Sequence, residues 1–415
     1  MSAGDGVLAG VGFWVFGCRL NQAEAAAWQA ALAARGVAIV PRESAAVVCV
    51  HSCAVTAPAL HEVVKAVRAL RRRRPDVRIV LSGCAAELVP AGLAELVLPH
   101  REKANWVARV MAYLAELPSE AFGAVTVRGR TRASLIVQDG CDRFCAYCIV
   151  PYLRGAPVSV PMAQLLREAA ELFARGYREI VLTGCHLALY RDPATGAGFE
   201  SLLAHLCDVP GAGRFRIGSI EPGVLDDVRL IRQIAGSGGR VCAFLHWPIQ
   251  SAADGVLARM GRPYRVADLQ RLMAAVAEWL PFCGLGADWI AGLPGETAAE
   301  AAETQRFVAA HPFTGAHIFP YSRRPGTRAA AFSDQCPEAV IRARAAALGA
   351  VAAERRAETL QRFVGRTLEV IPERQVAGLW EGWSAERLRC RLPFPAVRGQ
   401  PVSFCPTGVA GEKLV

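Results

Sequence analysis

Two long stretches of the chain alternate short apolar runs with helical patterns, and this alternation restricts the fold more than any other feature. In the first stretch, about residues 8–115, helical segments separate the runs VGFWVFG, AAVVCVHSC and VRIVLSGC. In the second, about residues 132–350, the strand–helix unit recurs roughly six times. Strands that are joined by helices run parallel, so we expect two α/β regions with parallel sheets.

The second stretch has the layout of a partial (β/α)6 barrel. Its strand candidates are ASLIVQD, EIVLTG, RFRIGSI, CAFLHWPI, GLGADWIAG and GAHIFPY. In such barrels the chemistry lies in the loops at the carboxyl ends of the strands. Beyond about residue 362 the helical period stops, and short pieces such as RTLEVIPE and RLRCRL are broken by Gly and Pro. This end predicts a small β-barrel.

Three cysteines of the first stretch stand just past the ends of predicted strands. Cys18 lies in FGCRLNQ, Cys53 in VHSCAVT and Cys84 in LSGCAAE. Ligands of an open parallel sheet bind outside the carboxyl ends of its strands, so these three thiols are expected to converge. The alternative is three packing thiols, because cysteine is often a core residue. A packing thiol is expected inside a strand, as at Cys49.

The segment GCDRFCAYCIVPYLRG, residues 140–155, contains three cysteines in the spacing C-x3-C-x2-C: Cys141, Cys145 and Cys148. A structural zinc site normally has four ligands, often in C-x2-C pairs. Three thiolates suit a [4Fe–4S] cluster in which one iron is open to a small molecule. Zinc binding or simple packing is the alternative.

Charge and cysteine usage limit the class of protein further. The 415 residues have a formal net charge of +10, which favours an acidic partner such as nucleic acid, although an arginine-rich surface alone also gives this charge. The N-terminus lacks the basic region of a signal peptide, and no uncharged apolar run is long enough to span a bilayer. We therefore expect a cytoplasmic protein, without membrane contact, whose 14 cysteines are free thiols or metal ligands.

These motifs together resemble the radical SAM methylthiotransferases along nearly the full chain. GCDRFCAYCIVPYLRG is similar to the cluster loop of that family, and FGCRLNQ, HSCAVT and SGCAAE resemble its N-terminal cysteine motifs. IGSIEP, HWPIQSAADGVLARMGRPY, DWIAGLPGET and FPYSRRPGT resemble its barrel motifs in the expected order. His51-Ser52-Cys53 departs from the more usual Asn-Thr-Cys.

The resemblance implies two [4Fe–4S] clusters and two molecules of S-adenosylmethionine per turnover. Cys141, Cys145 and Cys148 would hold the cluster whose open iron binds S-adenosylmethionine, and Cys18, Cys53 and Cys84 the second cluster. A radical derived from S-adenosylmethionine would activate C2 of an adenine in tRNA, followed by sulfur insertion and methylation. The cofactors supply this chemistry, and the protein positions them.

The resemblance also implies three domains and a set of further site residues. An N-terminal methylthiotransferase domain is expected at residues 8–118, a radical SAM core at 127–357 and a divergent, TRAM-like RNA-binding β-barrel at 360–415. The predicted cofactor pocket contains Tyr147, Glu221, Gln250 and Asp288. The alternative is that Glu221, Gln250 and Asp288 only satisfy a loop backbone. Trp380, Trp383 and Arg387 are candidates for RNA contact, or for the core and rim of the small barrel.

The substrate branch depends on two motifs. FGCRLNQ and LTGCHLALY resemble the branch that converts N6-threonylcarbamoyladenosine at position 37 of tRNA to its 2-methylthio derivative, with His186 as a pocket donor. The alternatives are the branch for N6-isopentenyladenosine, the branch for an aspartate of a ribosomal protein, and a regulatory iron–sulfur RNA-binding protein without activity. The expected partners are tRNA and an electron donor such as flavodoxin or ferredoxin, and the expected state is a monomer.

Overall fold

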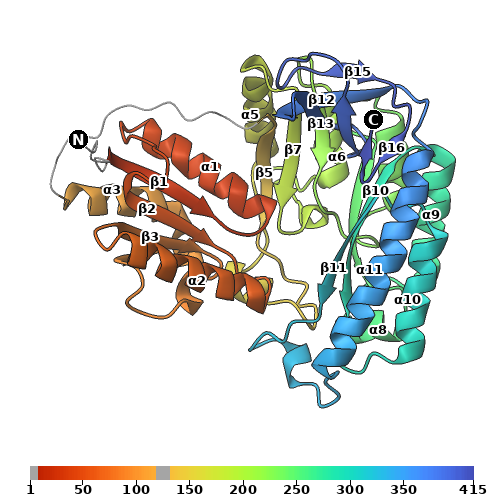
Figure 1. Ribbon diagram of the computed structural model, residues 1–415, viewed down its shortest axis with the longest axis horizontal. Coiled ribbons are helices and arrows are strands. Elements are labelled where there is room, and N and C mark those ends of the chain that lie inside the picture. The colour runs from red at the N-terminus through yellow and green to blue at the C-terminus, as the bar shows by residue number, and fades with distance from the viewer. Residues whose placement is uncertain (1–7, 118–130) are drawn as a thin grey trace. The chain divides into compact units, whose positions relative to one another are not determined.

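The computed structural model describes residues 8–117 and 131–415, which fold into two compact units (Figure 1). Among these residues, unit 1 comprises 8–117, Gly140–Phe144 and Cys148–Ala156, and unit 2 comprises 131–139, Cys145–Tyr147 and Pro157–Val415. Both units are α/β with parallel sheets, as the strand–helix alternation predicts, so the predicted fold class is confirmed. The finer domain boundaries stay predictions.

Unit 1 is a four-stranded parallel sheet between two layers of helices. The strands are β1 (Leu8–Val15), β2 (Ala45–Ser52), β3 (Arg78–Gly83) and β4 (Leu96–Val97), in that order. Helices α1 (Arg19–Ala33) and α3 (Trp106–Ala115) cover one face, and α2 (Ala57–Arg73) covers the other (Figure 1). Alternate residues of β2 serve the two cores: Val48 packs with Val63 of α2, and Cys49 packs with Trp106 of α3.

Unit 2 contains the partial barrel. Its six parallel strands are β5 (Ala133–Asp139), β7 (Glu179–Gly184), β8 (Arg214–Ile217), β9 (Phe244–Gln250), β10 (Gly284–Ala291) and β11 (Gly315–Pro320). They form two sheets, and isolated parallel bridges from Phe215 to Val241 and from Ser219 to His246 connect β8 with the β9 side. A two-residue antiparallel strand, β6 (Val158–Ser159), adds to β5; the apolar pattern is too short there to predict it.

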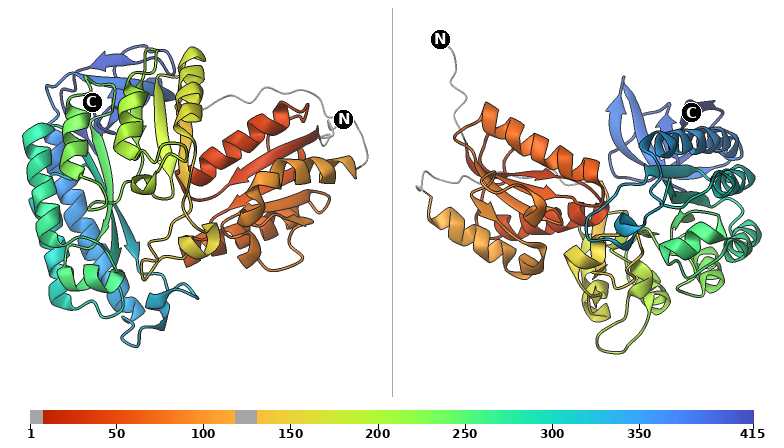
Figure 2. Two further views of the ribbon diagram at one scale, coloured as in Figure 1. Left: turned by 180° about the vertical axis from the view of Figure 1, so that it is seen from behind. Right: turned by 90° about the horizontal axis from the view of Figure 1, so that it is seen from below.

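Helices pack on the outer side of these strands (Figure 2). They are α5 (Met162–Ala174), α6 (Phe199–Cys207), α7 (Asp227–Ala235), α8 (Asp254–Met260), α9 (Val266–Trp279), α10 (Ala298–Ala310) and α11 (Glu338–Gln361). Helix α10 begins with the predicted capping box, in which Thr297 and Glu300 bond to each other's backbone N–H groups. Trp247 and Trp289 point into the core beneath the helices, so their strand neighbours point to the inner side.

The C-terminal end is a six-stranded sheet, called here the C-terminal sheet. Its strands are β12 (Leu368–Val376), β13 (Leu379–Ser384), β14 (Arg389–Leu392), β15 (Val402–Phe404), β16 (Val409–Ala410) and β17 (Lys413–Leu414), in the order β15-β12-β13-β14-β17-β16. The buried Arg216 of β8 pairs with Glu179 at 2.6 Å and donates to the backbone oxygens of Ser384 and Ala385. The two hydrogen bonds from Arg216 join the C-terminal sheet to the barrel strands within unit 2.

Within the described ranges, no helix combines the length and the apolar character that crossing a membrane requires.

Candidate functional site

The three strand-end cysteines of unit 1 lie together at one edge of the sheet. Gly17 has φ +88°, and a Cβ atom added there would lie 2.5 Å from Sγ of Cys53. A glycine is therefore required at this position between the end of β1 and Cys18. The backbone N–H of Cys84 donates to the Ser52 oxygen at 3.1 Å, which holds the turn after β3 against the turn after β2.

Asn21, at the start of α1, connects the three turns. Its Oδ1 lies 4.0 Å from Sγ of Cys18 and 3.9 Å from Sγ of Cys84. Its Nδ2 donates to the backbone oxygens of Phe16 at 3.0 Å and Ser52 at 2.8 Å. Asn21 is fully buried, so its amide fixes the positions of the strand ends that carry the cysteines.

A buried arginine lies directly beside this triad. Arg154 donates from Nε to Sγ of Cys84 at 3.0 Å, and from Nη2 to Asn21 Oδ1 at 2.8 Å. It also pairs with Glu24 at 3.0 Å, and Glu24 contacts His51 Nε2 at 3.2 Å. Burial alone would raise the pKa of Glu24, but the hydrogen bond from His51 and the charge of Arg154 hold that pKa well below its usual range.

The donor set of unit 1 suits an iron–sulfur cluster. Burial raises the pKa of the Cys84 thiol to about 11, against the opposing charge of Arg154, and also raises the pKa of Cys53. Thiols of this kind lose their protons when they bind a metal. Three converging sulfurs with a guanidinium donor at one of them fit a [4Fe–4S] cluster with one position open.

The cysteine loop has its own local supports. Gly140 has φ +72°, and an added Cβ would lie 2.0 Å from the Ala156 oxygen, so the loop requires glycine before Cys141. The Cys141 N–H donates to the Gly155 oxygen at 2.9 Å, which closes the loop on itself. Cys141 and Cys145 are buried, Cys148 is half-buried, and none of the three forms a disulfide.

Arg262 is the basic residue beside this second triad. Its Nη1 lies 3.6 Å from Sγ of Cys145 and 3.4 Å from the Tyr147 hydroxyl. The same group forms an ion pair with Glu221 at 2.9 Å, and Nη2 donates to the Pro248 oxygen at 2.6 Å. The structure therefore groups Cys145, Tyr147 and Glu221 around one buried cation.

Sequence reasoning missed Arg262 and Arg154. Arg262 stands in MGRPY and Arg154 in VPYLRG. Both arginines therefore lie inside motifs by which the chain resembles the methylthiotransferases. What was missing was the approach of each guanidinium to a cysteine sulfur, which only the tertiary structure provides.

His186 and Glu221 form a buried pair after β7 and β8. His186 Nε2 contacts the Glu221 carboxylate, and the His186 backbone N–H donates to Gln138 Oε1 at 2.8 Å. The second ring nitrogen, Nδ1, is buried and has no hydrogen-bond partner among the described residues. This nitrogen is available to a polar group of a ligand. The neighbouring Cys185 donates to Asp139 Oδ1 at 3.1 Å.

The two remaining predicted pocket residues lie in different settings. Gln250 ends β9, is buried and has φ +71°, an uncommon conformation for a residue with a side chain. Asp288 lies in the middle of β10, not at its end, and its carboxylate is bonded to His246 and His317. Asp288 is thus held by two histidines, and Gln250 stays a predicted pocket residue.

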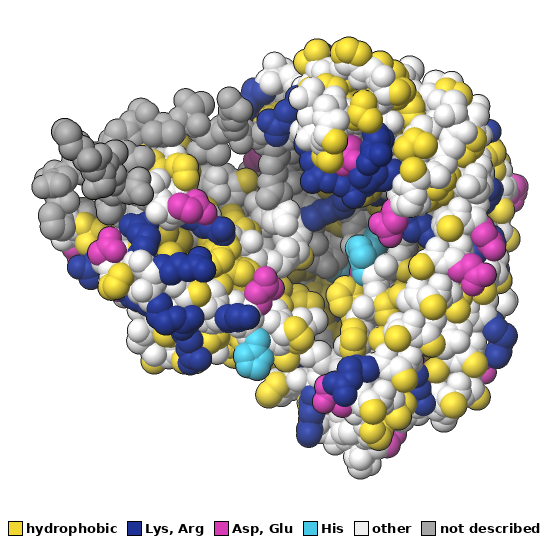
Figure 3. Space-filling model, viewed as in Figure 1, with side chains coloured by type: hydrophobic (Ala, Val, Ile, Leu, Met, Phe, Trp, Pro, Cys, Tyr) yellow, Lys and Arg dark blue, Asp and Glu magenta, His cyan; other side chains and the backbone are white. Residues whose placement is uncertain are grey.

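The predicted RNA residues separate into two groups. Trp380 packs against the core of the C-terminal sheet. The Arg387 guanidinium stacks on the Trp383 ring at 4.1 Å, beside a hollow of about 350 Å³ whose lining residues are Glu373, Arg374, Glu381, Gly382, Trp383 and Arg389. Basic side chains gather around an acidic one in this region (Figure 3).

Glu381 is the acidic centre of that group. Its buried carboxylate contacts Arg389 at 2.9 Å, Arg374 at 3.2 Å, Arg391 at 3.5 Å and also Lys413. Burial alone would raise the pKa of Glu381, but hydrogen bonds from Lys413 and Arg374 and the charge of Arg389 lower it to about 2. Four cations therefore share the Glu381 carboxylate, and the lining of the hollow itself carries two arginines and two glutamates.

Comparison with known proteins identifies the two α/β regions of the chain. Residues 135–308 match the Radical SAM superfamily, and residues 11–100 match Uncharacterized protein family UPF0004. The chain is also similar in fold to a radical S-adenosylmethionine methyltransferase, TsrM of Kitasatospora setae, with a TM-score of 0.54 over 76% of this chain and 74% of that chain, at 16% identity. The family match thus identifies residues 135–308 as a radical SAM domain, and the similarity to the solved structure shows a shared fold.

The curated relatives narrow the class. The chain is 34% identical to the threonylcarbamoyladenosine tRNA methylthiotransferase MtaB of Chlamydia pneumoniae, over 89% of this chain and 88% of the relative. It is 33% identical to the tRNA-2-methylthio-N(6)-dimethylallyladenosine synthase of Sphingopyxis alaskensis, over 87% of this chain and 86% of the relative. The chain therefore belongs to the radical SAM methylthiotransferase family, and it is an enzyme.

Membership of the family implies a [4Fe–4S] cluster and S-adenosylmethionine. The cysteine loop fits this requirement, because it offers three cysteines that form no disulfide and a buried cation at Cys145.

Proposed function

We propose that this enzyme converts N6-threonylcarbamoyladenosine at position 37 of tRNA to 2-methylthio-N6-threonylcarbamoyladenosine. The observation that carries the choice of substrate is the buried Nδ1 of His186, which has no partner among the described residues. The threonylcarbamoyl group has amide, hydroxyl and carboxylate functions that need hydrogen-bonding partners, whereas an isopentenyl group needs an apolar wall. Relatives named for the threonylcarbamoyl substrate at 32–34% identity support this choice.

The C-terminal sheet supports tRNA as the macromolecular substrate. Arg374 and Arg389 line its hollow, and the Trp383 ring in the same lining is stacked on Arg387. Cations that contact phosphates and aromatic rings that stack on bases are the two usual means of binding RNA. These residues favour tRNA as the substrate over a ribosomal protein, because a protein substrate has neither phosphates nor bases to bind.

The residues have separate tasks in this proposal. Cys141, Cys145 and Cys148 hold a [4Fe–4S] cluster that, with bound S-adenosylmethionine, supplies the radical chemistry. Arg262 places positive charge beside Cys145 and Tyr147 and is itself held by Glu221. Cys18, Cys53 and Cys84 hold a second cluster, with Arg154 and Asn21 as their neighbours.

His186 has a positioning task in the pocket. Its contact with Glu221 fixes the ring, and its backbone is fixed by Gln138. The ring is therefore held in one orientation, with Nδ1 available to the polar substituent of the adenine.

The test is nucleoside analysis of tRNA from a strain in which the gene is deleted. We expect loss of 2-methylthio-N6-threonylcarbamoyladenosine, with its precursor retained, and recovery when the wild-type gene is returned. A matched pair of returned genes sharpens the result. His186→Leu should fail to restore the product, whereas His205→Leu, a change at an exposed histidine of α6, should restore it.

A second candidate function is methylthiolation of N6-isopentenyladenosine. It is favoured by the relatives from Sphingopyxis alaskensis and Cereibacter sphaeroides, which are named as tRNA-2-methylthio-N(6)-dimethylallyladenosine synthases at 33% and 32% identity. Loss of the isopentenyl product, with the threonylcarbamoyl product unchanged, would select this candidate. A flavodoxin or ferredoxin as electron donor, a monomeric state and a cytoplasmic location remain part of our proposal.

A further inference from the structure

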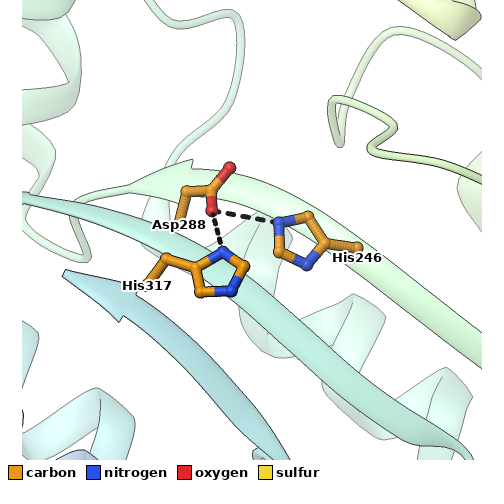
Figure 4. Close-up of side chains that lie close together, drawn as sticks. All are labelled: His246, Asp288 and His317. Carbon is orange, nitrogen blue, oxygen red and sulfur yellow. Dashed lines mark hydrogen bonds and ion pairs between the residues drawn. The ribbon is translucent and has the colours of Figure 1, made fainter. Parts of the chain in front are cut away.

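Three metal-ligating side chains from neighbouring barrel strands meet on the inner side of unit 2. They are His246 of β9, Asp288 of β10 and His317 of β11 (Figure 4). Asp288 is directly opposite His317 in the β10–β11 register, and His246 is opposite Gly286, two residues before Asp288. The three side chains therefore share one face of the sheet, opposite the face on which Trp247 and Trp289 enter the core.

The donor atoms of the three side chains are close together. Oδ1 of Asp288 lies 3.1 Å from His246 Nε2 and 3.0 Å from His317 Nδ1, and all three atoms lie within 4.8 Å of one another. Ligand atoms about 2.1 Å from a shared ion, at angles between 90° and the tetrahedral value, are about 3.0 to 3.4 Å apart. The two measured distances fall at the short end of that range.

The sequence makes room for this approach at Gly286. A Cβ atom added to Gly286 would lie 2.5 Å from Nδ1 of His246. Any larger residue would displace the imidazole, whose other nitrogen reaches diagonally across the strand to Asp288. The glycine thus allows the His246 ring to lie flat over β10 and to point toward the carboxylate.

The chemistry of the donors differs from that of both cysteine sites. Two imidazoles and one carboxylate are a common set for a divalent transition-metal ion with further positions open, whereas iron–sulfur clusters are held mainly by thiolates. Asp288 and His246 are mostly buried, which limits competition from water, and the His317 side chain is 68% exposed. An ion would therefore have access from the side of His317.

We propose that His246, Asp288 and His317 form a binding site for one divalent transition-metal ion of the zinc class, separate from both cysteine triads. The site goes beyond the proposed function, because neither the radical chemistry nor the choice of nucleoside requires it. Imidazole nitrogens and a carboxylate oxygen bind such an ion without a change in covalent state.

The experiment is equilibrium dialysis of the holoenzyme against micromolar zinc, with iron and zinc measured per chain. Both clusters are assembled first, so that the cysteine ligands are occupied. The variants are Asp288→Asn, which keeps the size of the side chain, His317→Ala, which changes an exposed residue, and Gly286→Ala, which leaves all three ligands in place. The control is His61→Ala, a change at an exposed histidine of α2.

We expect the wild-type enzyme and His61→Ala to hold one zinc ion more than the Asp288→Asn and His317→Ala variants, with equal iron in all. Gly286→Ala should raise the zinc Kd by about tenfold or more, as expected when the support of a metal ligand is displaced. Equal zinc in the wild-type enzyme, Asp288→Asn and His317→Ala would overturn the proposal, and the hydrogen bonds to Asp288 would then be the whole role of the cluster. Unchanged iron content shows that a variant has folded, so a loss of zinc alone is not explained by unfolding.

Discussion

The two cysteine triads of this chain each consist of three cysteines, but the cysteines of one come from distant parts of the sequence and those of the other from a single loop. Cys18, Cys53 and Cys84 come from three strand ends of one sheet, and they meet only after β1, β2 and β3 have paired. Cys141, Cys145 and Cys148 lie in a single loop that closes on itself through the Cys141–Gly155 hydrogen bond. The first triad therefore depends on long-range folding, and the second depends on local sequence.

Both triads nevertheless have the same kind of electrostatic support. Arg154 lies 3.0 Å from Cys84 and pairs with Glu24, while Arg262 lies 3.6 Å from Cys145 and pairs with Glu221. Each arginine and each glutamate is almost completely buried. Two unrelated backbone arrangements thus supply a positive charge beside a cysteine sulfur and balance it with a carboxylate.

The largest expected effect comes from removing the loop triad. Replacing Cys141, Cys145 and Cys148 together with Ala should abolish cleavage of S-adenosylmethionine, because no site for its cluster remains. Iron should fall from about eight to about four per chain after anaerobic reconstitution, if both clusters are cubanes. Iron analysis and measurement of 5′-deoxyadenosine test this. Full iron content in the triple variant would refute the assignment of the loop.

Removing one thiol of unit 1 should separate the two triads by function. The Cys53→Ala enzyme should still cleave S-adenosylmethionine, because the loop triad is intact, but it should form no methylthio product. Cys49→Ala is the matched control, since Cys49 is a packing thiol four residues earlier on β2. Methylthiolated tRNA formed at the normal rate by Cys53→Ala would show that the unit 1 triad is not needed for sulfur insertion.

The contrast between local and long-range construction also explains what the sequence could predict. The cysteine loop, the individual strands of unit 1 and the capping box at Thr297 follow from patterns within a few residues. Arg154, Arg262 and Asn21 were missed because their roles come from contacts with residues far away in sequence, such as the 70 positions between Arg154 and Cys84.

The His246–Asp288–His317 cluster was missed for a related reason. The strands CAFLHWPI, GLGADWIAG and GAHIFPY were predicted correctly as strands, and Asp288 was singled out. The register that places Asp288 opposite His317 and His246 opposite Gly286 is not written in any one strand. Gly286 was the available signal, because a glycine inside a strand often marks the close approach of another group.

Replacing each arginine with lysine should show whether Arg154 and Arg262 act on separate triads. Arg154→Lys removes the planar group that contacts Cys84, Glu24 and Asn21 at once, and a lysine cannot replace all these contacts. We expect product formation to fall by about 10- to 100-fold, the usual cost of removing an outer support of a metal site, with cleavage of S-adenosylmethionine nearly unchanged.

Arg262→Lys should give the reverse pattern. Its contacts are with Cys145, Tyr147 and Glu221, so cleavage of S-adenosylmethionine should fall by a similar factor. The ratio of 5′-deoxyadenosine to methylthio product is the decisive measurement. If both variants lowered the two activities in the same proportion, the two arginines would not serve separate triads.

The smallest expected effect is a change in protein stability that leaves both cysteine triads unchanged. Glu381→Gln, in the C-terminal sheet, removes the carboxylate that four cations share, and should lower the free energy of unfolding near pH 7 by about 1–3 kcal/mol. The pKa of Glu381 is lowered from 4.5 to about 2 in the folded chain. Its stabilising contribution is therefore complete above about pH 4.5 and is lost as the pH falls toward 2.

The measurement is thermal unfolding of the full chain at pH values from 7 to 3. The difference in stability between wild type and Glu381→Gln should shrink as the pH falls over that interval. Iron content near pH 7 should be the same in both, because neither Arg154 nor Arg262 contacts Glu381. A difference that stayed constant with pH would mean that the Glu381 carboxylate is not the source of the stabilisation.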